Sequence, residues 1–301
     1  MSHSHSHNDD NIRGSRLIIT MLLNFVITVA EIIGGIISGS LSLISDALHN
    51  FSDGISVIIS YSAIRLKKRP NTKKHTFGFK RAEILAALIN SAVLVAISFY
   101  LFYESAIRLM QPQEVKGGLM TIVALIGLIA NVIGTLLLKK DSQKSLNIKS
   151  AYLHLLSDAV SSAAVILGGL AIYFYNVYWL DPILTILISI YVLKESYEIL
   201  TDTLHVLMEG TPDNVSIEQI KKTVEQIEGV KDIHHLHIWS VGENDIHLET
   251  HINIDNMMTK ESDLIRTRVE EILHDKFSIN HSTIQFECGV CEGTDLIANH
   301  K

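Results

Sequence analysis

Two short polar elements interrupt apolar stretches of the chain. His49 and Asp53 are four residues apart, and His154 and Asp158 repeat that spacing. Residues at i and i+4 lie on one face of a helix, so each element would offer an imidazole nitrogen beside a carboxylate oxygen. Two such helices packed together present two nitrogen and two oxygen ligands. This set predicts a tetrahedral Zn²⁺ site, with Co²⁺ and Cd²⁺ as chemical mimics, and suits Mg²⁺ or Ca²⁺ poorly because those ions prefer oxygen alone.

The two elements belong to a longer internal repeat with an offset of 105 residues. The identical positions are Ser45/Ser150, Leu48/Leu153, His49/His154, Ser52/Ser157 and Asp53/Asp158. Ionisable side chains at the centre of a membrane helix cost at least ~2.5 kcal/mol each, so they are rarely present without a role. The alternative is that these side chains only bond to one another as structural contacts. Two copies in register favour the metal site.

The front part of the chain is apolar enough to form a membrane domain. Of its 301 residues 48% are hydrophobic, and the mean hydropathy is +0.28. A bilayer core about 30 Å thick needs roughly 20 mainly apolar residues per helix. The stretches that meet this requirement lie near 16–37, 41–64, 82–107, 118–138, 151–174 and 179–200. We therefore expect an all-α bundle of six membrane helices over 16–206, after a flexible, His-containing N-terminus at 1–15.

Basic residues are unevenly distributed over the predicted loops. Cytoplasmic loops are enriched in Lys and Arg, which allows the orientation to be predicted. The turns after the first and fifth predicted helices have no basic residue, and the loop after the third has only Arg108 and Lys116. The opposite side carries Arg13, Arg16, Arg65, Lys67, Lys68, Arg69, Lys73, Lys74, Lys80, Arg81, Lys139, Lys140, Lys144 and Lys149. Both termini should therefore be cytoplasmic.

From about residue 207 the sequence becomes acidic and water-soluble. Residues 207–301 contain 18 acidic and 8 basic side chains, against 14 and 17 before them, and the net charge is −7. The stretches 216–229 and 261–277 have the periodicity of amphipathic helices, whereas 230–239, 245–255 and 282–287 are typical of strands. This order predicts a small α+β domain of the ferredoxin-like αββαβ type over 207–301.

The two cysteines, Cys288 and Cys291, form a C-x-x-C pair in this acidic part. A secreted disulfide scaffold would carry more cysteines at wider spacings, so the pair indicates a reducing compartment. The start, MSHSHSHNDD, lacks the features of a cleaved signal peptide. Its histidines, His3, His5 and His7, either capture metal at the cytoplasmic entrance or are dispensable.

The sequence closely resembles the cation diffusion facilitator family, in particular its cobalt-zinc-cadmium resistance and zinc-transporter branch. The resemblance rests on the paired H-x-x-x-D elements, on HTFGFKRAEILAALIN at 75–90, and on HHLHIWSV and STIQFE in the tail. It implies a homodimer that works by alternating access and binds the transported ion through His49, Asp53, His154 and Asp158. Two His–Asp pairs resemble the zinc-selective members, because an added imidazole discriminates against the harder Mn²⁺.

The resemblance also implies a metal site in the cytoplasmic domain. His234, His251 and Glu287 match positions that carry regulatory metal in relatives. Cys288 and Cys291 lie where zinc transporters have a C-x-x-C that can complete such a site.

Two other family features are less well matched. His75 lies where some relatives bind a further metal, but the positions that complete that site are Thr72 and Phe79, so we expect no metal there. Arg81 and Glu209 resemble a charge pair that stabilises relatives' dimers, or are two solvated charges. Further polar residues fall inside the predicted helices and either line an ion pathway or bond between helices. They are Asn24, Glu31, Glu83, Asn90 and Asn131. Asp46 lies one turn before His49, a position suited to the outer mouth, and we leave it outside the site.

These features predict a secondary active efflux transporter. Imidazole binds metal only when neutral and carboxylate only when ionised, so protons and metal compete for the same groups. With an ordinary histidine pKa near ~6.5, this competition falls in the physiological range. We expect Zn²⁺, and also Co²⁺ or Cd²⁺, to leave the cytoplasm in exchange for protons across a prokaryotic plasma membrane. Nothing in the sequence predicts a nucleic-acid partner.

Two other classes of protein compete with a transporter. A membrane metalloprotease would carry H-E-x-x-H and an open coordination position, and the sequence contains no such motif. A closed site of four ligands leaves no place for a catalytic water, so we expect no enzyme. A membrane-anchored metal sensor would explain the tail ligands but not four ligands inside the membrane.

Overall fold

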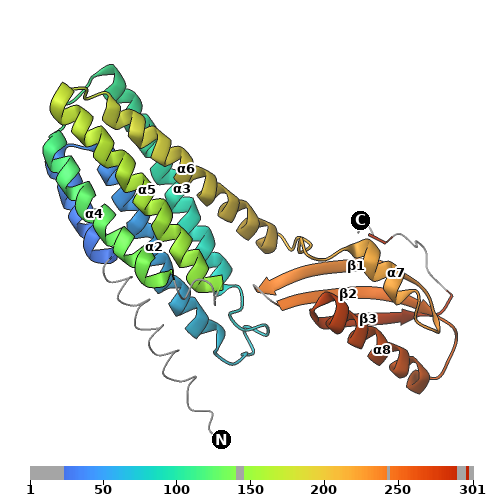
Figure 1. Ribbon diagram of the computed structural model, residues 1–301. Helices are drawn as coiled ribbons and strands as arrows, with labels where there is room; N and C mark the ends of the chain where they lie inside the picture. The colour runs from blue at the N-terminus through green and yellow to red at the C-terminus, as the bar shows by residue number, and fades with distance from the viewer. Residues whose placement is uncertain (1–23, 140–145, 243–244, 290–295, 298–301) are drawn as a thin grey trace, which may run out of the picture. The chain divides into compact units, whose positions relative to one another are not determined.

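The computed structural model describes residues 24–139, 146–242, 245–289 and 296–297 (Figure 1). The chain divides into two compact units. The first, which is helical, contains the residues up to Ser60 together with Ile89–Ile199. The second contains Tyr61–Leu88 together with the residues from Leu200 onward, and it includes a three-stranded sheet.

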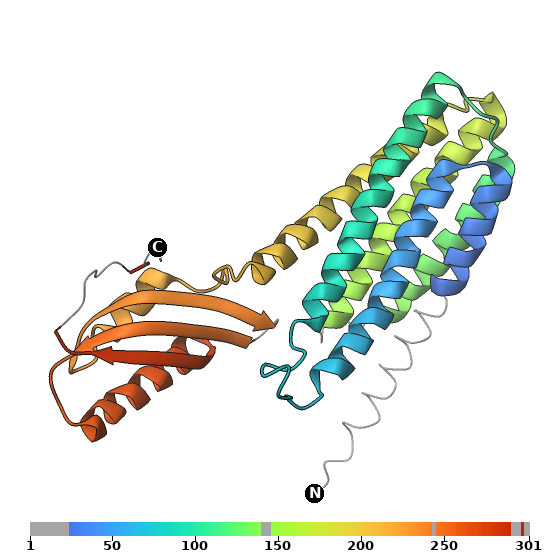
Figure 2. The ribbon, with the colours of Figure 1, turned by 180° about the vertical axis from the view of Figure 1, so that it is seen from behind.

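Long helices lie side by side in the first unit (Figures 1 and 2). A helix over residues 24–38 comes first. The helices that follow are α2 Leu41–Lys67, α3 Ala82–Met110, α4 Gly117–Leu138, α5 Leu146–Tyr175 and α6 Leu180–Leu207, and the ends of α2, α3 and α6 belong to the second unit. Each apolar stretch expected from the sequence is thus helical over its described residues.

Within the described residues, three helical segments are long and apolar enough to cross a membrane by length and composition. They are Ala82–Met110, Gly117–Leu138 and Tyr152–Tyr175. The helix over 24–38 is shorter than a full span within its described residues. α2 and α6 are long enough, but polar side chains such as Asp46, Asp53 and Glu195 lower their hydropathy. The unit is therefore an integral membrane domain with three clear spans.

Small residues allow α4 and α5 to approach closely. A Cβ atom at Gly117 would lie only 2.6 Å from the carbonyl oxygen of Gly169, so these backbones are nearly in contact. Such small-residue interfaces are common between membrane helices. Leu43, Met120 and Val165 are fully buried in the cluster shared by α2, α4 and α5. This packing holds the two helices of the internal repeat in one core.

The second unit contains a helix–strand–strand–helix–strand sequence, as expected. Its elements are α7 Ile217–Val224, β1 Val230–Gly242, β2 Asp245–Ile254, α8 Thr259–Phe277 and β3 Ile279–Glu287. The strand order is β1-β2-β3, with β1 antiparallel and β3 parallel to β2 (Figure 2). Ile220 of α7 and Leu273 of α8 share one buried core with Leu248 of β2. Both helices therefore cover the same face of the sheet.

A bulge interrupts β1 at the start of its histidine-rich segment. His235 has a φ of +49°, and the pairing with β2 shifts between His234 and His237. A bulge places two residues of one strand opposite one of its partner and turns the side chains. Ile233 and Leu236 consequently both face the core although they are three residues apart, whereas a regular strand would place them on opposite faces.

Candidate metal centre

The start of α2 is held by a carboxylate from another helix. Asp181 of α6 is fully buried and accepts hydrogen bonds from the hydroxyls of Ser40 and Ser42, both at 2.6 Å. It also accepts the backbone N–H of Leu41 at 2.7 Å. The first N–H groups of a helix lack partners within it and carry partial positive charge, so a carboxylate satisfies both needs. Sequence reasoning missed this role, because an Asp at a helix start normally caps its own helix.

The four predicted transport ligands come from two helices. His49 Nε2 lies 3.5 Å from Asp53 Oδ2 on α2, and His154 Nε2 lies 3.5 Å from Asp158 Oδ2 on α5. Between the helices, His154 Nε2 lies 3.3 Å from Asp53 Oδ2. One ligand atom each of His49, Asp53 and His154 lies within 4.8 Å of the other two. Asp158 does not belong to this group of three, but its Oδ2 contacts His154 Nε2.

These separations fit one tetrahedral ion. Ligand atoms at about 2.0–2.1 Å from a tetrahedral Zn²⁺ lie about 3.3–3.4 Å from one another. The facing atoms also lack a well-formed hydrogen bond to any described residue. They are both ring nitrogens of His49, Asp53 Oδ2, His154 Nε2 and Asp158 Oδ2. Buried polar atoms nearly always have a partner, so this unpartnered nitrogen and oxygen set is suited to a cation.

The repeated serines attach the two ligand helices to different neighbours. Ser52 of α2 donates a hydrogen bond to Asn90 Oδ1 of α3 at 2.8 Å. Ser157, its equivalent in α5, donates to the hydroxyl of Tyr191 in α6 at 3.0 Å. That hydroxyl donates in turn to Glu195 at 2.6 Å. The repeat therefore includes one serine per ligand helix that is hydrogen-bonded to a neighbouring helix beside the aspartate.

Tyr191 is a site residue that sequence reasoning missed. Its ring packs edge-on against the imidazole of His49, with ring centroids 6.4 Å apart. A tyrosine in an apolar helix has no spacing that distinguishes it from an interfacial anchor. Only the packing of α6 beside α2 shows that it forms a wall of the cluster.

A second cluster lies in the sheet of the second unit. His234 of β1 and His251 of β2 are opposite each other in register, and Glu287 ends β3. Glu287 Oε2 lies 3.2 Å from His234 Nε2, and Glu287 Oε1 lies 2.7 Å from His251 Nδ1. Asp232, which was not predicted, lies 2.8 Å from His234 Nδ1. A carboxylate on the second nitrogen is typical of metal-binding histidines, because it fixes the tautomer and ring orientation.

The predicted cysteine ligands do not join this cluster in the described structure. Cys288 is exposed with a free thiol and is absent from the ligand groups found among the described residues. Cys291 lies outside the described residues. The described set is therefore two imidazoles and one carboxylate, which leaves one position of a tetrahedral ion open.

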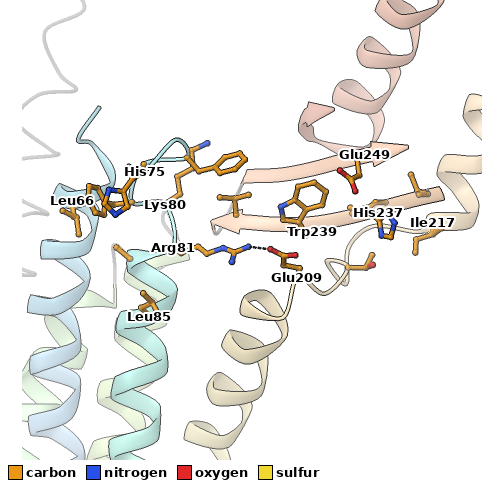
Figure 3. Close-up of a pocket in the computed structure, with 18 of the residues that line it drawn as sticks. Leu66, His75, Lys80, Arg81, Leu85, Glu209, Ile217, His237, Trp239 and Glu249 are labelled. Carbon is orange, nitrogen blue, oxygen red and sulfur yellow. Dashed lines mark hydrogen bonds and ion pairs between the residues drawn. The ribbon is translucent and has the colours of Figure 1, made fainter. Parts of the chain in front are cut away.

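The loop before α3 borders a cavity of about 860 Å³ within the second unit (Figure 3). Trp239, His237 and Glu249 line it from the sheet. Arg81 Nη2 donates to Glu209 Oε1 at 3.0 Å at this cavity, so the two charges form an ion pair (Figure 3). The role of this pair in a dimer stays a prediction.

His75 also lines this cavity, but it belongs to none of the ligand groups found in the described part of the chain. Its ring stacks against Phe79 with centroids 4.6 Å apart. Its backbone forms hydrogen bonds with Thr72. Neither neighbour offers the imidazole or carboxylate that a metal site would need.

The fold and the two clusters define a metal-handling protein with a helical membrane domain and a small α/β domain. Residues 17–208 match the cation efflux transmembrane domain, and residues 212–288 match the cytoplasmic domain of cation efflux proteins. The chain belongs to the cation efflux family. The family resemblance inferred from the paired H-x-x-x-D elements is thereby confirmed.

The chain is similar to bacterial members over nearly its full length. It is 38% identical over 97% of its length to the metal cation efflux system protein CzcD of Cupriavidus metallidurans, of which it covers 92%. It is 38% identical over 94% of its length to the cadmium, cobalt and zinc/H(+)-K(+) antiporter of Bacillus subtilis, of which it covers 91%. It is 34% identical over 99% of its length to the zinc transporter ZitB of Escherichia coli, of which it covers 96%.

A solved structure, the metal-bound C-terminal domain of the CzcD transporter, matches 24% of the chain at 34% identity with a TM-score of 0.22.

Proposed function

We propose that this protein exports Zn²⁺-like divalent cations from the cytoplasm in exchange for protons by alternating access. The transported ion is held by His49, Asp53, His154 and Asp158. The proposal rests on one observation. Histidine nitrogens and aspartate oxygens of α2 and α5, which lack hydrogen-bond partners among the described residues, lie 3.3–3.5 Å from one another. One relative is named as a cadmium, cobalt and zinc antiporter and another as a zinc transporter, which supports this class of cargo.

The ligand chemistry explains both the cargo and the counter-ion. Two imidazoles and two carboxylates suit Zn²⁺ and also accept Co²⁺ or Cd²⁺. The same groups bind protons, so a site that loses metal on an acidic side gains protons there and returns with them. The antiporter name of the Bacillus subtilis relative is consistent with proton exchange.

The proposal also covers the number of membrane helices, the domain bounds and the orientation of the protein. Six helices cross the membrane within 16–206, the His-containing N-terminus occupies 1–15, and 207–301 is a ferredoxin-like cytoplasmic domain for dimerisation and metal binding. Both termini face the cytoplasm, and the protein works as a homodimer in a bacterial plasma membrane. Helices on all six apolar stretches, the two matched family domains and the bacterial relatives support these assignments.

Everted membrane vesicles test the function directly. Vesicles that contain the full chain should take up Zn²⁺ when their interior is acidic, and collapse of the pH gradient should stop the uptake. His49→Ala and Asp158→Ala should abolish it. His274→Ala is the matched control, because His274 is an exposed histidine of α8 paired only with Asp275 in the described structure. Uptake by His49→Ala at the wild-type rate would refute the transport site.

The second candidate is a membrane-anchored metal sensor, which the cluster of His234, His251 and Glu287 favours. Asp158→Ala separates the two functions. A transporter with this substitution loses metal tolerance in cells while the tail still binds metal. A sensor keeps its metal response.

A further inference from the structure

Glu31 is a buried acidic residue of the first unit that lies outside the metal cluster and forms no ion pair with any described residue. Glu31, in the helix over 24–38, has no exposed surface. Its Oε2 accepts a hydrogen bond from Asn50 Nδ2 of α2 at 3.3 Å. Its Oε1 has no hydrogen-bond partner among the residues that the structure describes.

The neighbouring helix α4 is shaped to receive this carboxyl group. A Cβ atom at Gly127 would collide with Glu31 Oε1, so a larger residue there would displace the carboxyl group from its present position. Gly34 meets Val123 one turn away, which shows that the two helices run antiparallel. Asn131, one turn beyond Gly127 on the same face, is buried, and neither amide atom has a partner within the described ranges. This face of α4 thus carries uncharged residues beside the helix of Glu31.

The charges around Glu31 determine whether its carboxyl group is protonated. Asp46 of α2 and Asp158 of α5 are buried acidic residues that contribute to the electrostatic environment of Glu31. Gly127 and Asn131 of α4 bring no charge. A buried carboxylate without a cation is strongly disfavoured. Glu31 is therefore a neutral carboxylic acid until a positive charge arrives nearby.

The metal cluster supplies such a charge. Asn50, the hydrogen-bond partner of Glu31, directly follows His49 in α2. A divalent cation bound to His49 and Asp158 adds two positive charges beside the acidic groups that interact with Glu31. In a medium of low dielectric constant this charge favours ionisation of a nearby acid.

We propose that Glu31 is a proton-carrying residue of the exchange, separate from the four metal ligands. The proposal rests on the transport function proposed above. When the cation enters from the cytoplasm, the O–H bond of Glu31 breaks and the proton leaves to cytoplasmic water. When the cation has left on the other side, Glu31 takes a proton from water there. One proton per cation thus moves on a group that never touches the metal.

Calorimetry on the purified full chain tests the assignment. Zn²⁺ binding is measured in buffers of different ionisation enthalpy, which gives the number of protons released per ion. Glu31→Gln keeps the shape of the side chain and should still bind Zn²⁺ while it releases one proton fewer than the wild type. Glu104→Gln, a membrane-helix glutamate paired with Arg108, is the control and should release the wild-type number. Unchanged proton release by Glu31→Gln would overturn the proposal.

Infrared difference spectroscopy gives an answer even if Glu31→Gln does not fold. The wild-type protein should lose a band of a buried protonated carboxyl group when Zn²⁺ is added. Glu31→Asp should shift this band, and its absence or constancy contradicts the proposal. A wild-type protein that binds and transports no Zn²⁺ instead defeats the proposed function. The two failures are therefore distinguishable.

Discussion

His154 Nε2 lies closer to Asp53 Oδ2 of the other helix, at 3.3 Å, than to Asp158 Oδ2 of its own helix, at 3.5 Å. The two H-x-x-x-D elements therefore form one cluster instead of two separate pairs. A small slide or rotation of α2 against α5 would separate Asp53 from His154 and leave each in-helix pair intact. Helix shifts of about 1–2 Å are a common form of switching transition, so this cross-helix contact is where the site would open.

Asp53→Asn tests the cross-helix contact. The amide keeps the size of the side chain but lacks the charge that binds the cation and faces His154. Substitution of an outer-shell partner of a metal ligand costs about 10–100-fold in affinity, so loss of a direct ligand should cost more than ~100-fold. Isothermal titration of the purified protein with Zn²⁺ measures this. Asp263→Asn, in the exposed part of α8, should bind Zn²⁺ as the wild type does, and equal affinity of the two variants would contradict the ligand role of Asp53.

Asp181→Ala should destabilise the membrane domain. It leaves the hydroxyls of Ser40 and Ser42 and the N–H of Leu41 without their acceptor in a buried place. An unsatisfied buried donor costs about 1–3 kcal/mol, so we expect a loss of at least ~2 kcal/mol in the free energy of unfolding. Thermal unfolding in detergent measures it. Ser42→Ala removes one of these donors and should lower the melting temperature by less; an equal effect would argue against a shared cap.

Metal should stabilise the second unit through His234, His251 and Glu287. A ligand that binds only the folded state stabilises it by about 2.7 kcal/mol at one hundred times its dissociation constant. The full chain with Asp158→Ala, which silences the transport site, should therefore show a Zn²⁺-dependent rise in the melting temperature of this unit. A chelator should reverse it. Adding His251→Ala should remove the rise and adding His274→Ala should not; a rise that survives His251→Ala places the metal elsewhere.

His247 should make the second unit less stable in acid. Burial against Phe77, Trp239 and His281 lowers the pKa of His247 below 6.5, although the nearby Asp245 opposes this. The unfolded chain then binds a proton at a higher pH than the folded chain. The stability that neutral His247 contributes to the folded unit is fully present above about pH 6.5 and is lost as the pH falls below that value.

Unfolding of the full chain between about pH 7 and pH 5 tests this pH dependence. His247→Gln should flatten the loss of stability at low pH. His274→Gln, at an exposed site, should keep the wild-type slope. Identical slopes for His247→Gln and the wild type would show that His247 is not the responsible group.

The four proposed ligands of the transport cluster could be named from the sequence because their information is local. An i, i+4 pair such as His49 and Asp53 shares a helix face whatever the helix packs against, and the copy at His154 and Asp158 made chance improbable. The helices and strands were likewise predictable from apolar periodicity. The resemblance to the family added His234, His251 and Glu287, which no local spacing connects with one another.

The contacts between elements could not be derived in this way. Which aspartate faces His154, which carboxylate caps α2, and which tyrosine covers His49 all depend on how helices far apart in the sequence pack together. In the sheet, the bulge at His235 sets His234 opposite His251, and Asp232 orients the ring. Glu31 was recognisable as an intramembrane polar residue, but only the packing of Gly127 against it shows a space made for its carboxyl group. Local residue types thus determined the chemistry available, and tertiary packing decided which groups meet.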